Sequence, residues 1–151
     1  MPVAARAIQK PTLDGVHLRD GTEADLSFVR ATMQKELTRL WPYRSPCDEK
    51  LLFHRLVQVL PKLLSRSDLR MADVNGAIAA FAIIDRHAPL VHWVHTAVPY
   101  RRQGLARVLL STLSKGWRAS HDTSHGANLL KALGGVFDPY ALYMEASDGE
   151  V

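Results

Sequence analysis

The most constraining feature of this sequence is residues 91–110, where a strand-like run leads into a basic loop and then into a helix-like run. Residues 90–98 are rich in Val, Trp and Thr and apolar on both faces, which is typical of a central strand. Residues 104–117 carry Leu, Val and Trp at helical spacing, which predicts an amphipathic helix. A buried strand followed by a packed helix predicts an α/β fold.

The loop between these two elements combines backbone and side-chain donors. Gly104 lets the main chain approach a ligand closely, and Ala106 is small enough to keep that space open. Amides in the first turn of a helix have no acceptor within the helix and lie at the positive end of its dipole. With Arg101 and Arg102 beside them, they favour a ligand that contains phosphate. An arginine-rich helix start that binds nothing is the alternative interpretation.

The rest of the chain predicts a six-stranded sheet with intervening helices. Strands are expected at residues 16–19, 69–74, 77–84, 90–98, 118–122 and 136–144. Helices are expected at residues 23–40, 48–61, 104–117 and 126–133. Asn75-Gly76 predicts a tight hairpin, and Pro61 should end or kink the second helix. The order is β-α-α-β-β-β-α-β-α-β, an α/β (α+β) arrangement.

Length and composition predict one domain. The chain has 151 residues, and we expect an N-terminal arm at 1–13, a single domain at 14–147 and a short acidic tail at 148–151. Its one cysteine, Cys47, has no partner for a disulfide within the chain, and it is interpreted as an ordinary small residue. Residues 1–13 lack the apolar run of a secretory signal, and no segment has about 20 apolar residues. We therefore expect a cytoplasmic protein without a membrane span.

The charge distribution indicates an anionic ligand more than a nucleic acid. Nineteen Lys and Arg against fifteen Asp and Glu leave a net charge of +4, which is small for a nucleic-acid-binding protein. Basic side chains gather in residues 101–118, whereas acidic ones gather in the tail. Such a local positive field suits a polyanion, although a solvated basic face produces the same pattern.

The central segment resembles the GNAT (Gcn5-related N-acetyltransferase) family. The family signature, Arg/Gln-x-x-Gly-x-Gly/Ala between a strand and a helix, is matched by Arg101-x-x-Gly104-x-Ala106 after Tyr100. The order of elements matches as well, and the resemblance is strongest over residues 70–118. It implies a mixed, mostly antiparallel sheet flanked by helices. It also implies an acetyl-CoA-dependent N-acyltransferase, in which an amine attacks the thioester directly.

The resemblance implies a binding site for acetyl-CoA, the acyl-donor cosubstrate. Its pyrophosphate would bind the backbone N–H groups of Arg101, Arg102, Gln103, Gly104, Leu105 and Ala106. In this family the preceding strand splays from its neighbour and pairs with the pantetheine arm, here through Val94, His95 and Thr96. The N–H of Thr96 would polarise the thioester oxygen. Asn128 matches a position that often contacts the arm.

Acyl transfer requires a base, because the attacking amine must lose a proton. His92 is a candidate base, because strand alternation places it on the same face as Val94, with His95 on the opposite face. In the GNAT family the base often lies on this strand and points into the substrate groove. Asp85, at the end of the preceding strand, is a second candidate. A hydrogen-bonded core histidine is the alternative interpretation of His92.

A general acid is harder to identify. The family often has a tyrosine acid in the helix before the final strands, where this chain has Leu130, so Tyr140 and Tyr143 are the candidate acids. No metal site is expected, because His92 and His95 are predicted on opposite faces and no pair of cysteines is present.

Several functional alternatives remain open at this stage. The absent tyrosine is compatible with a non-catalytic GNAT-fold structural or interaction subunit of a larger assembly, and homodimers are frequent in the family. Trp41, Pro42 and Tyr43 would either line an acceptor pocket or close the core over the first two helices. The acceptor amine does not follow from the fold.

Overall fold

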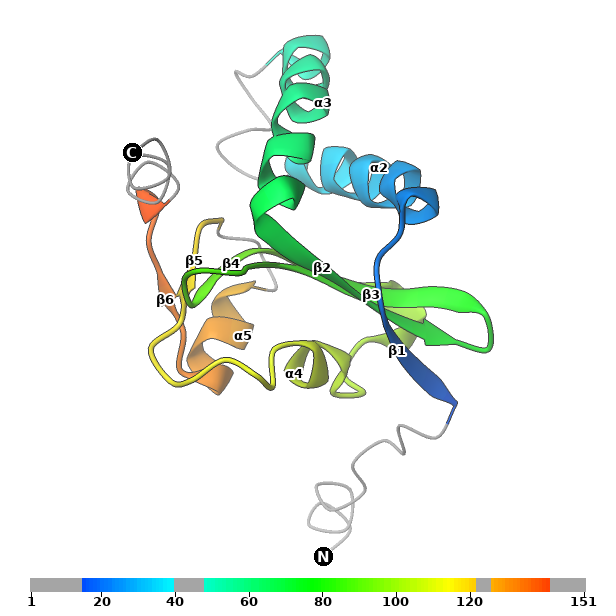
Figure 1. The fold of residues 1–151 in the computed structure, drawn as a ribbon, viewed down its shortest axis with the longest axis vertical. Coiled ribbons are helices and arrows are strands. Elements are labelled where there is room, and N and C mark those ends of the chain that lie inside the picture. Colours follow the sequence, from blue (N-terminus) through cyan, green and yellow to red (C-terminus); the bar gives the residue numbers. More distant parts are fainter. Residues whose placement is uncertain (1–14, 40–47, 122–125, 142–151) are drawn as a thin grey trace, which may run out of the picture.

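The computed structural model describes residues 15–39, 48–121 and 126–141, which form one sheet with helices on both faces (Figure 1). The strands are β1 (Val16–Asp20), β2 (Ser67–Val74), β3 (Ala77–Asp85), β4 (Leu90–Thr96), β5 (Arg118–Ala119) and β6 (Val136–Phe137). They lie side by side in that order. The pairs from β1 to β4 are antiparallel, whereas β4–β5 and β5–β6 are parallel. The predicted mixed, mostly antiparallel sheet and its order of elements are confirmed.

The helices divide the core into two parts. Helices α2 (Leu26–Leu37) and α3 (Glu49–Arg66) cover one face, and α4 (Leu105–Leu109) and α5 (Gly126–Leu133) cover the other (Figure 1). The short 3-10 helices are η1 (Glu23–Asp25) and η2 (Val98–Tyr100). The α2/α3 face buries Met71, Phe81, Ile83 and Trp93. The α4 face buries Ala82, Ile84, Val91, Leu105, Leu109 and Trp117.

Several predicted elements in the C-terminal half are shorter than expected, including the strand predicted at 118–122, which spans only Arg118–Ala119. The helix predicted at 104–117 ends at Leu109, because residues 110–116 form turns that include Gly116 at φ 89°. These turns bring Trp117 into the core beneath the sheet. The last strand spans only Val136–Phe137, after which Ala141 N–H turns back to Asp138 C=O at 3.2 Å.

Helix α3 continues past Pro61 to Arg66, so of the two predicted effects, an end or a kink of the helix, the first does not occur. Pro61 is exposed and lacks the N–H of a helical hydrogen bond. The leucines on either side of it, Leu60 and Leu63, are buried. Burying two leucine side chains stabilises by about 3–6 kcal/mol, enough to offset a proline within the helix.

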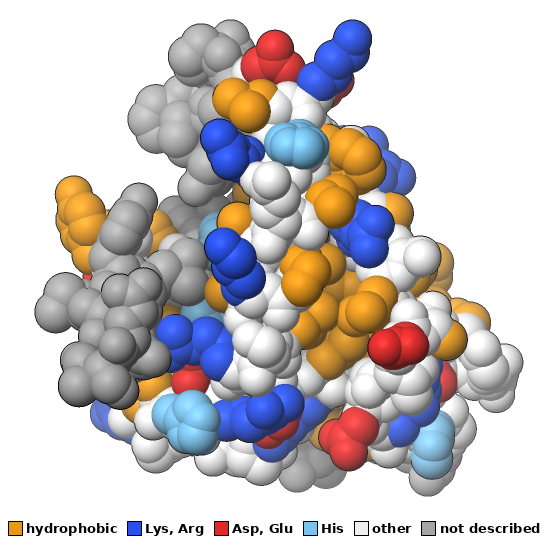
Figure 2. Space-filling model, turned by 45° about the horizontal axis from the view of Figure 1, so that its top comes forward, with side chains coloured by type: hydrophobic (Ala, Val, Ile, Leu, Met, Phe, Trp, Pro, Cys, Tyr) orange, Lys and Arg blue, Asp and Glu red, His pale blue; other side chains and the backbone are white. Residues whose placement is uncertain are grey.

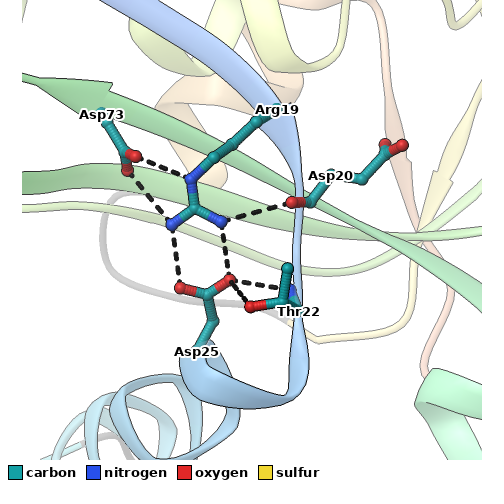
Figure 3. Close-up of polar contacts among 5 residues, drawn as sticks. All are labelled: Arg19, Asp20, Thr22, Asp25 and Asp73. Carbon is teal, nitrogen blue, oxygen red and sulfur yellow. Dashed lines mark hydrogen bonds and ion pairs between the residues drawn. The ribbon is translucent and has the colours of Figure 1, made fainter. Parts of the chain in front are cut away.

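Arg19 joins the edge strand β1 to two other elements (Figure 3). Its Nε donates to Asp73 Oδ2 on β2 at 2.6 Å, and its Nη1 and Nη2 donate to Asp25 at 2.7 and 2.8 Å. Asp25 also accepts the backbone N–H of Thr22 at 2.8 Å, so the capping box predicted from these two residues is present. The hydrogen bond from Arg19 lowers the pKa of Asp25 to about 2.

The surface over α2 and α3 is apolar in part. Figure 2 shows orange side chains between Lys and Arg on this side of the molecule. Those more than a third exposed are Phe28, Leu51, Phe53 and Val59. Among the described residues, no helix combines the length and the apolar character needed to cross a bilayer.

Candidate functional site

Strands β4 and β5 separate soon after they pair. Their register joins only Leu90 with Arg118 and Val91 with Ala119. The last backbone bond between them runs from Ser120 N–H to Val91 C=O at 3.0 Å. In the part of the chain that the structure describes, residues 92–96 of β4 have no further strand partner on this side. We call the opening between residues 92–96 and the end of β5 the fork.

The pairing of β4 with β3 determines which amides face the fork. Ala97 N–H donates to Ala79 C=O at 2.8 Å, and the register continues without a shift back to Trp93. Bonded and non-bonded pairs alternate along an antiparallel ladder. Val94 and Thr96 therefore direct their N–H and C=O groups toward the fork, whereas His95 directs its own toward β3.

The loop after β4 has an unusual backbone conformation. Arg102 and Gly104 both have positive φ, 63° and 83°. Glycine accepts this conformation without strain, but an arginine there is uncommon. Left-handed residues two positions apart turn successive N–H groups to one side, as in the backbone concavities that bind anions.

The amides of this loop lack an acceptor in the part of the chain that the structure describes. Among the described residues, no carbonyl or side chain accepts the N–H groups of Gln103, Gly104, Leu105 or Ala106. The helix that follows has only five residues, so its dipole contributes little to anion binding. The hydrogen-bond donors available to an anion are therefore the loop amides themselves. This differs from the long helix that the sequence predicted.

Side chains hold the loop against the end of β4. Arg101 Nε donates to Thr96 C=O at 3.0 Å, and Gln103 Nε2 donates to Pro99 C=O at 3.4 Å. Arg102 is exposed beside them. The predicted phosphate-binding residues thus lie together at the end of the strand that borders the fork.

His92 does not lie where strand alternation placed it. The β3–β4 register shifts between Ile83 and Ile84, which pair with Trp93 and Val91 respectively. His92 is therefore the extra residue of a β-bulge. A bulge resets the alternation, so the prediction that His92 shares a face with Val94 was wrong.

Contacts place His92 on the α2/α3 face of the sheet. Its Nε2 lies 3.5 Å from Asp85 Oδ2, and Asp85 accepts a bond from Arg66 of α3 at 2.8 Å. Val94 packs on the opposite face with the α4 core. The two candidate bases that the sequence offered as alternatives are thus neighbours.

Two further side chains extend this pair. His92 Nδ1 lies 3.1 Å from Ser120 Oγ, and Ser120 Oγ lies 2.9 Å from Nδ1 of His121. Asp85, His92 and Ser120 are buried, and His121 is partly buried against the ring of Trp93. Ser120 was missed by the sequence analysis, because only the short β4–β5 pairing brings it to His92.

The protonation states within this chain of groups differ. Burial raises the pKa of Asp85, but the His87 N–H and the Arg66 guanidinium more than offset it and leave the pKa below its usual value. Burial and the nearby charge of His92 lower the pKa of His121 to about 4, although a hydrogen bond to the His92 backbone opposes this. Near pH 7, Asp85 is ionised and His121 is neutral.

His95 belongs to a separate cluster. Its Nδ1 lies 2.5 Å from Glu36 Oε1 on α2, and the same carboxylate accepts the indole N–H of Trp93 at 2.8 Å. The side chain of His95 therefore faces the helices, while its backbone pairs with β3.

The remaining predicted residues lie apart from the fork or outside the described structure. Tyr140 is exposed beyond β6, two strands from β4. Leu130 packs against the α4 core. Outside the described residues lie Tyr143, the side chain of Asn128, Cys47, Trp41, Pro42, Tyr43, the arm at 1–13 and the tail at 148–151. Within the described ranges, no three His, Cys, Asp or Glu side chains are grouped to hold a metal ion.

Known structures share this architecture. No family model and no curated protein sequence matches the chain. A predicted acetyltransferase with acetyl-CoA from Clostridium acetobutylicum is 17% identical, with a TM-score of 0.54, covering 79% of this chain and 88% of the other. A protein from Pyrococcus furiosus assigned as an acetyl transferase is 11% identical, with a TM-score of 0.55, covering 87% and 91%. At these identities the likeness concerns the fold, and it confirms the GNAT fold expected from residues 70–118.

Proposed function

We propose that this chain, which has the GNAT fold, is a cytoplasmic N-acetyltransferase that binds acetyl-CoA and transfers the acetyl group to an amine. One observation carries the proposal: the N–H groups at positions 103–106 have no acceptor among the described residues, and they adjoin an open strand edge. A phosphate-bearing ligand with a long amide-containing arm satisfies both sets of groups.

The pyrophosphate and the pantetheine arm of acetyl-CoA would each bind a different part of the chain. The loop amides and the exposed Arg102 bind the pyrophosphate, which carries negative charge. The outward N–H and C=O groups of Val94 and Thr96 bind the amides of the pantetheine arm, as a neighbouring strand would. Thr96 also accepts a bond from Arg101, which ties the arm-binding edge to the loop.

The position of the acyl group in the fork determines how the amine would attack it. The arm directs the thioester along β4 toward the closed end of the fork, beside His92 and Ser120. The amine nitrogen bonds to the acyl carbon as the carbon–sulfur bond breaks, the amine loses one proton and the thiolate gains one. Holding both reactants in the fork supplies much of the rate, and no covalent enzyme intermediate is needed.

A non-catalytic GNAT-fold subunit is the second candidate. One observation favours it: Leu130, which stands where the family often has a tyrosine acid, packs against the core. The two candidates differ in turnover, because a subunit without catalysis releases no thiol from acetyl-CoA with any amine.

Calorimetric titration with acetyl-CoA tests the binding site. Gly104→Glu introduces a carboxylate where the phosphates bind, so we expect affinity to fall at least about 100-fold. Gly76→Glu is the matched control, because Gly76 also has a positive φ of 81° but lies in a hairpin with open space around it. Equal affinity of the wild type and the Gly104 variant would refute the site.

A panel of amines then tests the reaction. The panel includes a peptide N-terminus, a lysine peptide, a polyamine and an aminoglycoside, and the readout is the thiol released from acetyl-CoA. Release that depends on one amine class supports the enzyme. Tight binding of acetyl-CoA without release by any amine supports the subunit.

A further inference from the structure

Asp85, His92, Ser120 and His121 form a connected chain of side chains at the closed end of the fork. They come from the end of β3, the bulge of β4 and the residues after β5. Three contacts join them, at 3.5, 3.1 and 2.9 Å. Polar groups inside an apolar core cost free energy unless they have polar partners. The two contacts of Ser120 are of hydrogen-bond length, and the contact between His92 Nε2 and Asp85 is within ion-pair distance.

At the inner end of this series of side chains, the carboxylate of Asp85 can stabilise positive charge on the His92 imidazole. Asp85 has no exposed side-chain surface and is bonded to Arg66 and to the backbone N–H of His87. Because it remains ionised, it does not itself take up a proton near pH 7. Its carboxylate instead favours a proton on His92 Nε2, which faces it. Asp85 is a positioning residue.

Ser120 links the two histidines through its side chain. Its Oγ lies within hydrogen-bond distance of Nδ1 on both rings. A hydroxyl can donate to one nitrogen while it accepts from the other. Reversing this pattern moves one proton from ring to ring without moving any heavy atom.

The outer end is His121, the only one of the four residues that is not fully buried. The groups that face it are the Trp93 ring, with centroids 5.3 Å apart, the Ser120 hydroxyl and His92. Glu36 lies beyond the indole of Trp93, to which it is bonded. No carboxylate is among the contacts described for His121, and the hydrogen bond to the His92 backbone, which favours the protonated ring, does not offset the effect of burial.

We propose that these four groups, the fork relay, accept the proton that an attacking amine releases, which rests on the proposed function. The proton adds to the His121 ring, the Nδ1 proton of His121 passes to Ser120 Oγ, and the hydroxyl proton of Ser120 passes to Nδ1 of His92. His92 then carries one added proton beside Asp85. The reverse transfer returns this proton to the departing thiolate, so the relay ends each turnover unchanged.

The relay assigns a role to Ser120 that a conservative variant can test. Ser120→Ala removes the hydroxyl but little volume, and Ser120→Thr restores it. Loss of a positioned acid or base typically costs 10²–10⁴-fold in rate. We expect Ser120→Ala to lower kcat about 100-fold at unchanged KM for acetyl-CoA, and Ser120→Thr to recover most of it. Ser111→Ala, at an exposed serine after α4, is the matched control.

A second measurement needs neither acetyl-CoA nor turnover. In the free protein, ¹⁵N NMR of the imidazole rings follows the titration of His92 and His121. We expect each ring's signals to respond to protonation of the other, and Ser120→Ala to abolish this response. Independent titration of the two rings in the wild type, or a Ser120→Ala variant with wild-type kcat, would overturn the relay. If the protein does not bind acetyl-CoA, the proposed function is overturned. The NMR titration of the free protein then decides by itself whether the two histidines are coupled through Ser120.

Discussion

Two titratable residues, Asp25 after β1 and His121 after β5, lie in partly or fully buried positions. Arg19 bonds to Asp25 and Asp73, and His121 is partly enclosed beside Trp93. In both places the folded chain shifts a pKa away from its usual value, Asp25 to about 2 and His121 to about 4. A shifted pKa makes stability depend on pH, so both sites can be tested without a ligand.

The Asp25 site predicts a loss of stability in acid. Its folded pKa lies below the unfolded one, so its contribution is complete above about pH 4 and disappears as the pH falls toward 2. We expect Asp25→Asn to destabilise by about 2 kcal/mol at pH 7, measured by urea unfolding. Because wild type loses this contribution in acid, the difference should shrink by pH 2.5. A constant difference would contradict the assignment.

The His121 site predicts a loss of stability at a higher pH. The unfolded ring takes up a proton near pH 6.5 and the folded ring only near 4, so stability decreases as the pH falls between these values. From pH 7 to 5, wild type should lose about 2 kcal/mol more than His121→Gln. If the free energy of unfolding of the two proteins decreases in parallel over this pH range, burial does not lower the pKa of His121 in the folded protein.

Local patterns along the chain predict its elements, whereas contacts between strands determine the site. The hairpin at Asn75-Gly76 and the capping box at Thr22 follow from adjacent residues, and both are present. The bulge at His92 depends on the register with β3, which no pattern near His92 reveals. For the same reason the sequence offered His92 and Asp85 as separate candidates and missed Ser120.

The conformation of the loop at positions 101–106 was partly predictable. Its glycine and arginines at the start of an expected helix predicted a phosphate site. The helix that follows proved to be five residues long, because the chain turns at 110–116 to bury Trp117. Such burial is a tertiary effect that overrides helical periodicity.

Helix α3 allows a test of the balance between local and tertiary effects. Pro61 is exposed and lies inside the helix without an N–H to donate. We expect Pro61→Ala to restore one helical bond and to stabilise the protein by about 1–3 kcal/mol in urea unfolding. Lys62→Ala, at the exposed neighbouring position, should change stability by less than about 0.5 kcal/mol. A destabilised Pro61→Ala variant would show that the proline shapes the helix.

At the scale of the whole molecule, helices lie on both faces of the sheet, and among the described residues one edge of β4 has no strand partner beyond Val91. The sheet is continuous from β1 to β4, and the parallel pairing with β5 ends after two residue pairs. The loop donors lie at one end of this opening and the fork relay at the other. A ligand that spans the opening would therefore join the two halves of the sheet.

Such a ligand should stabilise the folded chain. At a concentration 100 times its Kd, acetyl-CoA would add about 2.7 kcal/mol, which corresponds to an increase in Tm of about 5–10 °C for a domain of this size. Differential scanning fluorimetry should show this increase for wild type and Gly76→Glu. Gly104→Glu, with an affinity at least about 100-fold lower, should show an increase of at most about 1–2 °C.

The account's central claim is that the loop amides and the outward edge of β4 bind one extended ligand. Amide ¹H–¹⁵N NMR during titration with acetyl-CoA tests it most directly. We expect the largest shifts at Val94, Thr96 and residues 103–106, with a downfield amide proton shift at Gly104 on binding the pyrophosphate. If these amides do not shift, or if the changes gather on the α2/α3 surface instead, the claim is contradicted.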